Sequence, residues 1–167
     1  LPFVIVMTVL MNDAYSLLSP AAQAAYLAND LADLTYADDT LLLGVSKKFV
    51  QEYLFAVATA GSRYGLELHS GKLQLMTVNG SISLHTPEGD TISQADEIGY
   101  LGTNLHRDGK TNNELCRRIG MAKRDFDLLS KVWRRSCLSC RHKIRIYNAL
   151  VESKLLYGIA ACCLTCL

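Results

Sequence analysis

Few residues of this sequence break regular structure, and most of the chain has no residue that could form a disulfide. Only three of the 167 residues are proline, and cysteine is absent before Cys116. Half of the residues are hydrophobic, 20% are charged, and no tract is repeated or of low complexity. This composition excludes a disordered, collagen-like or solenoid protein. It predicts a folded chain with apolar material for one domain, or one and a half.

The sequence also lacks a hydrophobic run long enough to cross a bilayer. The apolar stretch from Leu1 to Met11 is too short for a span, and no basic residue precedes it as in a signal peptide. We therefore expect a buried helix there and no membrane association. Because the chain begins with Leu inside this run, we expect it to be a piece of a longer protein.

The cysteines are confined to the last third of the chain and are not spread as in a secreted disulfide framework. They are Cys116, Cys137, Cys140, Cys162, Cys163 and Cys166. We expect reduced thiols in an intracellular protein of the cytoplasm or nucleus. Two C-x2-C pairs have the spacing of a four-cysteine zinc site. The segment between them is predicted to be helical, and a helix of about 20 residues is ~30 Å long. We therefore do not expect zinc.

Basic residues are missing from the beginning of the chain. Residues 1–46 contain five acids and neither lysine nor arginine. Residues 1–106 together hold 4 bases and 11 acids, a net charge of −7, whereas residues 107–167 hold 13 bases and 5 acids, a net charge of +8. The overall charge of +1 therefore conceals two oppositely charged parts. Such asymmetry points to a polyanion as partner of the basic part and to a cation as partner of the acidic part.

The first part combines helices with short strands. Residues 1–18 are apolar nearly all round and predict a core helix that ends before Ser19-Pro20. Two short apolar runs, 34–37 and 40–45, flank Asp38-Asp39 and predict a hairpin with both carboxylates at its tip. Ser46 is followed by apolar residues at helical spacing, which predicts a helix that ends near Gly61 to Gly65.

The hydrophobic period changes after Asp108-Gly109. Between residues 66 and 105, turn residues punctuate short apolar runs and predict a small antiparallel sheet. Beyond this point the apolar residues follow steps of three and four and predict one long amphipathic helix with a basic outer face. Its apolar seam is Leu115, Ile119, Ala122, Phe126, Leu129 and Trp133. A second helix is predicted from Ile144 to Leu155. We expect one domain over residues 1–106 and an all-helical one over 107–167.

The Asp38-Asp39 pair is the first candidate site. Two adjacent carboxylates at a turn repel each other, and no basic residue lies nearby in the sequence. Hard oxygen ligands of this kind suit Mg²⁺ or Mn²⁺, which proteins bind through one or two carboxylates, water and substrate phosphates. The alternative is an exposed turn whose aspartates only interact with water and with local backbone donors.

The sequence Tyr36-Ala37-Asp38-Asp39 between apolar strands resembles the YxDD box at the palm hairpin of reverse transcriptases. Other segments resemble further blocks of the non-LTR (LINE-type) enzymes, in the same order along the chain. These segments are residues 1–13, residues 60–68 with Lys72, the Tyr100-Leu101-Gly102 turn, and the stretch from 108 to 158. The resemblance covers almost the whole chain.

The resemblance implies an α+β fold that consists of a partial polymerase palm followed by an all-α thumb. In the palm, helices would pack on a small antiparallel sheet that carries the YADD hairpin. The parent protein would be an RNA-directed DNA polymerase, which transfers a nucleotide from a dNTP to a primer 3′ end on an RNA template. Catalysis in this family uses two divalent cations.

The same resemblance implies roles for individual residues. Asp38 and Asp39 would be the catalytic metal ligands, Asp38 the more direct of the two. Lys72 would be catalytic as a proton donor to the leaving pyrophosphate, although a surface lysine at the start of a strand is the alternative. Tyr100, Leu101 and Gly102 would grip the primer, although an ordinary β-turn with a core tyrosine would give the same pattern.

The basic helices would face the duplex of RNA template and DNA primer. The candidate residues lie off the apolar seam and could reach phosphates without unburying the core. They are Arg117, Arg118, Lys123, Arg124, Lys131, Arg134 and Arg135. Such contacts give salt-dependent binding that does not depend on sequence. The alternative is a solvated helix face.

Several features depart from a working polymerase. The third catalytic aspartate of the family and the fingers lie upstream of the YADD hairpin, and the sequence contains no motif that matches either. His69 stands where the family usually has Asn. We therefore expect the isolated chain to be inactive. A hypothesis from another class is a non-catalytic nucleic-acid-binding or structural remnant of a decayed retroelement.

Overall fold

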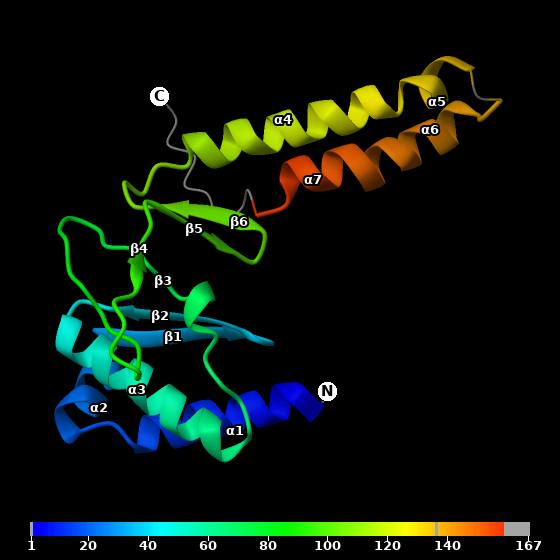
Figure 1. Cartoon of the computed structure of the whole chain (residues 1–167). Helices are drawn as coiled ribbons and strands as arrows, with labels where there is room; N and C mark the ends of the chain where they lie inside the picture. Colours follow the sequence, from blue (N-terminus) through cyan, green and yellow to red (C-terminus); the bar gives the residue numbers. More distant parts are fainter. Residues whose placement is uncertain (1, 136, 159–167) are drawn as a thin grey trace. The chain divides into compact units, whose positions relative to one another are not determined.

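The computed structural model describes residues 2–135 and 137–158 and divides the chain into two compact units, Leu1–Leu101 and Gly102–Leu167. Figure 1 shows the order of the helices and strands. In the first unit, helices α1 (Pro2–Ser16) and α2 (Pro20–Leu27) follow each other closely. Ser19 starts α2, because its hydroxyl accepts a hydrogen bond from the Ala22 amide at 3.3 Å and Pro20 favours the first helical position.

The predicted hairpin is present. Strands β1 (Leu31–Tyr36) and β2 (Asp39–Gly44) are antiparallel, with Tyr36 opposite Asp39. The connection is therefore a two-residue turn, Ala37-Asp38. Helix α3 (Lys47–Arg63) follows Ser46 as predicted, and α1, α2 and α3 lie on the same side of the hairpin (Figure 1).

The main core of the first unit lies between these helices and the hairpin. Leu31 of β1 and Tyr53 of α3 are its largest fully buried side chains, and small residues such as Ala14 and Ala60 let α1 and α3 approach closely. Helix α1 buries only one face. Ile5 and Val9 on its other face are exposed, so the predicted core helix is buried on one side only. None of the described helices is both long enough and apolar enough to cross a membrane.

The remaining strands differ from the predicted antiparallel sheet. After the 3₁₀ helix η1 (Ser70–Lys72), strand β3 (Gln74–Leu75) pairs in parallel with β4 (Ser93–Gln94). Within the described residues, the strands form three separate two-stranded sheets instead of one. The parallel pairing is possible because the connection between β3 and β4 is more than a dozen residues long, enough for the chain to return in the same direction.

A hairpin of β5 (Glu97–Tyr100) and β6 (Thr103–His106) leads into the second unit, whose first residue lies in its turn. Two helical segments follow. The first comprises α4 (Asn112–Leu128) and α5 (Ser130–Arg135), so the predicted single helix is interrupted at Leu129. The second is a continuous run of α6 (Cys140–Tyr147), then the π-helical turn η2 (Asn148–Glu152) and then α7 (Ser153–Leu156).

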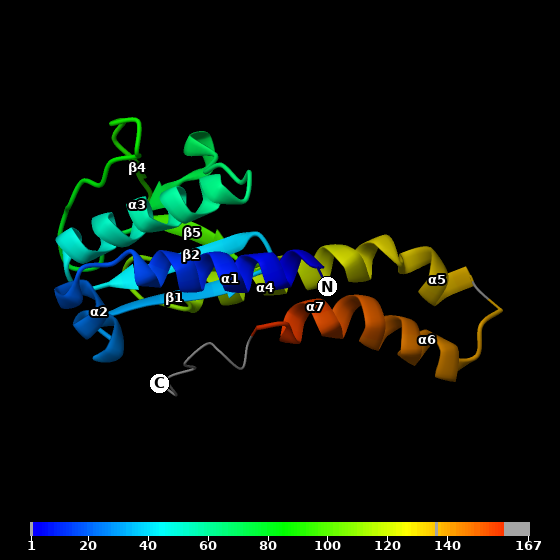
Figure 2. The ribbon, with the colours of Figure 1, turned by 90° about the horizontal axis from the view of Figure 1, so that it is seen from below.

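The two helical segments of the second unit lie side by side. Helix α4 contacts both η2 and α7, and Figures 1 and 2 show the two segments running along each other. Ala122 and Val151 are buried between them, whereas Ile119 and Phe126 of the predicted seam are about half exposed. Phe126 stacks on Trp133 at a ring-centroid distance of 5.7 Å. The seam therefore packs on a single neighbouring helix, which leaves part of it open.

Candidate functional site

The hairpin turn presents both candidate carboxylates to solvent. Asp38 is the second residue of the turn and Asp39 the first residue of β2, and both are exposed. Ala37, the first turn residue, has φ +54°, a left-handed conformation that is unfavourable for residues with a Cβ. Backbone strain of this kind persists only where the surrounding structure fixes it, and it is concentrated at functional sites.

The hairpin is fixed on the face that meets the helices. Tyr26 of α2 and Tyr53 of α3 each donate a hydrogen bond of 2.7 Å to the same oxygen of Asp33, and Thr35 contacts its other oxygen at 3.3 Å. Burial and the Asp33 carboxylate raise the pKa of Tyr53 well above its ordinary value of 10.0, so that its phenol remains a donor. Asp33 thus joins both helices to the strand that leads to Ala37.

Sequence reasoning did not single out Asp33 as a functional residue. The available signal is its register, because strand alternation puts it on the same face as Leu31, which lies in the core. A carboxylate on a core-facing position needs hydrogen-bond donors, and tyrosines on neighbouring helices can supply them. The sequence alone does not say which tyrosines do so.

The opposite face of the hairpin is open and apolar. Leu34, Tyr36 and Leu43 are 50%, 65% and 43% exposed. Tyr36 shares this face with Asp39, its partner in the ladder. The hydroxyl of Tyr100, a predicted primer-grip residue, donates a hydrogen bond of 2.9 Å to the Leu34 carbonyl. The structure therefore brings Tyr100 to the strand that carries the YADD turn.

Lys72 is exposed at the end of η1, two residues before β3. Among the contacts of the described residues, no hydrogen bond or ion pair links it to Asp38 or Asp39. Within the same residues, no group of three or more His, Cys, Asp or Glu side chains could hold a metal ion. The carboxylates of the turn are thus a pair to which the described residues add no third ligand.

The predicted primer-grip turn continues into the second unit. Leu101 and Gly102 both have positive φ, +48° and +74°. The Gly102 carbonyl accepts hydrogen bonds from two guanidinium groups, Arg117 at 2.9 Å and Arg118 at 2.6 Å. The prediction that all of the basic candidates lie off the core is wrong for Arg118, whose side chain is only 5% exposed.

Glu114 binds the same two arginines. It accepts from Arg117 at 2.7 Å and from Arg118 at 2.6 Å, and also from the Asn104 amide at 3.2 Å. The hydrogen bonds from Arg117 and then from Arg118 outweigh burial and lower the pKa of Glu114 to about 2. One buried carboxylate thus neutralises part of the charge that the sequence assigned to phosphate binding.

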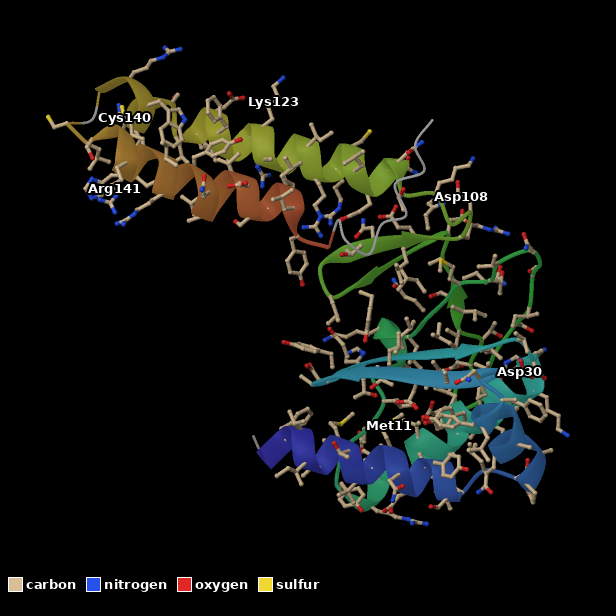
Figure 3. The ribbon with its side chains drawn as sticks, turned by 180° about the vertical axis from the view of Figure 1, so that it is seen from behind. Met11, Asp30, Asp108, Lys123, Cys140 and Arg141 are labelled. Atoms are coloured by element: carbon tan, nitrogen blue, oxygen red, sulfur yellow. The ribbon has the colours of Figure 1, made fainter. Side chains whose placement is uncertain are left out.

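Four other basic candidates are exposed as expected: Lys123, Arg124, Lys131 and Arg134. Figure 3 shows Lys123 projecting from α4 on the side away from α6 and α7. An open hollow of about 430 Å³ lies along this face of α4, and Lys123, Arg124 and Asp127 line it together with Gly120 and Leu128. The side chain of Arg135 lies outside the described part of the chain.

The cysteine pairs are only partly described. Cys137 and Cys140 are exposed and form no disulfide, and the same holds for Cys116. Cys163 and Cys166 lie outside the described residues, so the expectation that the cysteine pairs do not bind zinc stays untested.

Comparison with protein families identifies the first unit. Residues 3–105 match the family described as reverse transcriptase (RNA-dependent DNA polymerase). The match includes the Asp38-Asp39 turn, the Asp33 anchor and Lys72, and it covers more than half of the chain. The chain therefore belongs to the reverse transcriptase family. Searches of curated proteins and of solved structures each found no match.

Proposed function

We propose that this chain is the later palm and the thumb of a non-LTR (LINE-type) reverse transcriptase. The observation that carries the proposal is the strained two-residue turn, which presents Asp38 and Asp39 to solvent inside the segment that matches the family. Residues 1–106 would be the palm part and residues 107–167 the thumb. The order of a hairpin-bearing unit and a helical unit supports this division.

The donor set of the turn fits Mg²⁺ or Mn²⁺. Both side chains supply hard carboxylate oxygens, both are exposed, and two carboxylates together with substrate phosphates are a common way of binding Mg²⁺. Asp38 and Asp39 would hold the cations, which when bound neutralise charge on the triphosphate and activate the primer 3′ oxygen. Lys72 would donate a proton to the leaving pyrophosphate.

The remaining candidates would hold the nucleic acid. Tyr100, Leu101 and Gly102 would contact the primer backbone. The exposed lysines and arginines of α4 and α5 would contact phosphates of the RNA–DNA duplex. Such residues bind phosphates without reading the base sequence. This role is supported by the net charge of +8 over residues 107–167.

We expect no DNA synthesis by this chain alone, because the described residues add no third acidic ligand to the pair at the turn. A nucleic-acid-binding role without catalysis is the second candidate, and the basic face of α4 favours it. Primer extension on an RNA template, assayed with the purified chain and Mg²⁺, tests the inactivity that both candidates predict. Robust extension would contradict the inactivity that we expect.

Metal binding tests the turn directly. With Mn²⁺ as a paramagnetic probe, we expect the amide NMR signals of Ala37 and Thr40 to broaden first. Asp38→Asn and Asp39→Asn should each weaken this broadening. Glu88→Gln is the matched control, because Glu88 is an exposed acid at a different turn. Equal broadening around Glu88 would show unspecific binding to carboxylates and would overturn the metal assignment.

A further inference from the structure

Arg118 differs from the other basic residues of α4. Its side chain is only 5% exposed, as is that of Glu114, and burial of an arginine is tolerated only when its charge and its donors are satisfied. Its guanidinium donates to Glu114 through Nε at 2.6 Å and to the Gly102 carbonyl through Nη2 at 2.6 Å. These contacts hold the guanidinium of Arg118 inside the unit, where it does not face a phosphate in solvent.

The same guanidinium connects three segments of the second unit. Besides the two short bonds, Nη2 lies 3.3 Å from the Thr103 hydroxyl and Nη1 lies 3.4 Å from the Lys154 carbonyl. The centroid of the Tyr157 ring lies 4.9 Å from the guanidinium carbon, within the range of a cation–π contact. A planar group with fixed donor directions can make these contacts simultaneously, whereas a lysine ammonium cannot.

The Leu101-Gly102 turn, which Arg118 contacts, adopts a backbone conformation that the sequence of the turn does not favour. Two consecutive residues with positive φ, Leu101 and Gly102, are typical of a type I′ turn, whose first central position prefers Asn, Asp or Gly. A leucine there costs conformational energy, because its Cβ crowds the neighbouring carbonyl oxygen. Such a conformation persists when other contacts fix it, and Arg117 and Arg118 supply two hydrogen bonds to the Gly102 carbonyl.

We propose that Arg118, held by Glu114, is a positioning residue that fixes the Leu101-Gly102 turn to α4, and that it is not a phosphate contact. The function of the turn rests on the proposed contact with the primer. In that case Arg118 acts on primer binding through the position of Gly102. The exposed basic residues Lys123 and Arg124 on the same helix remain candidates for direct phosphate contacts.

The position of the turn is tested by NMR of the whole chain. Arg118→Lys keeps the charge but removes the planar guanidinium with its fixed donor directions, so it should shift the Gly102 carbonyl ¹³C and Thr103 amide signals. Glu114→Gln keeps the size of the side chain but removes its charge, and it should shift the same signals. Lys123→Gln is the matched control on α4 and should leave them in place.

Binding to an RNA–DNA duplex then separates positioning from phosphate contact. Arg118→Lys should weaken affinity about tenfold with an unchanged salt slope, whereas Lys123→Gln should lower the slope by about one. The positioning role is overturned if Arg118→Lys leaves both the Gly102 signals and the affinity unchanged while Arg118→Gln lowers the slope. If the wild-type chain does not bind the duplex but the Gly102 signals shift, Arg118 positions the turn and the nucleic-acid function is wrong.

Discussion

The Tyr53 hydroxyl donates a hydrogen bond of 2.7 Å to the Asp33 carboxylate and so joins the centre of α3 to the strand that leads to the YADD turn. Tyr53 is only 1% exposed, and Asp33 has a second phenolic donor in Tyr26. The strained turn residue Ala37 is therefore attached to a rigid support, as the proposed metal site would require.

Removal of the Tyr53 hydroxyl should weaken the attachment of the hairpin to α3. Tyr53→Phe leaves a cavity the size of a hydroxyl and removes one donor from Asp33, so we expect the free energy of unfolding to fall by ~1–2 kcal/mol. Tyr26→Phe is the control, and we expect a smaller loss because Tyr26 is only partly buried. Urea unfolding of both variants measures the difference. Equal losses would show that the deeper burial of Tyr53 does not increase the contribution of its hydroxyl to stability.

Acid should destabilise the second unit through Glu114. Its pKa is lowered to about 2 in the folded chain from an ordinary value of 4.5, so its contribution is complete above pH 4.5 and is lost as the pH falls through 2. The shift corresponds to roughly 3 kcal/mol. Glu114→Gln should remove this part of the pH dependence, which thermal unfolding between pH 2 and 6 measures. A wild-type profile that the substitution leaves unchanged would contradict the ion-pair network.

Two glycine substitutions should change stability in opposite directions. Gly102 has φ +74°, and a Cβ there would have room, with the Tyr157 ring 3.7 Å away, so Gly102→Ala should cost ~1 kcal/mol through its backbone conformation. Gly120 is inside α4 with open space around it, so Gly120→Ala should stabilise the chain by ~0.5–1 kcal/mol. Thermal unfolding of the two variants tests both signs. A stabilising Gly102→Ala would mean that the turn is not left-handed in solution.

Affinity for an RNA–DNA duplex should fall as salt rises. If Lys123 and Lys131 each contact one phosphate, the double variant with glutamine at both positions should reduce the salt slope by about two. Lys47→Gln removes one charge from α3, outside the proposed interface, and should not change the slope. Titrations at several salt concentrations measure it. An affinity that does not vary with salt would exclude residues 107–167 as the proposed phosphate-binding surface.

Much of the local structure could be predicted from the sequence. The Asp38-Asp39 hairpin follows from two apolar runs with a turn between them, and α3 follows from apolar residues at helical spacing after Ser46. The parallel pairing of β3 and β4 could not be predicted. Each strand is only two residues long, and the direction of their pairing depends on the path of the long connection between them.

The candidate site, too, could be predicted from the sequence only in part. The sequence supplies Asp38 and Asp39 and places them at a turn, but it does not say that the donors to the core-facing Asp33 are Tyr26 and Tyr53. Helical periodicity counts every arginine of α4 as polar and therefore as exposed. Arg118 is buried because the Gly102 carbonyl joins Glu114 around its guanidinium, and a one-dimensional pattern does not place that carbonyl beside α4.

By itself, the sequence determined that an acidic unit with a carboxylate turn precedes a basic helical unit, because charge and hydrophobic period are properties of the chain order. Only the tertiary structure decided which polar groups face inward. It turned Asp33 towards two tyrosines and Arg118 towards Glu114 and Gly102, because a buried charge is stable only where its partners converge in space.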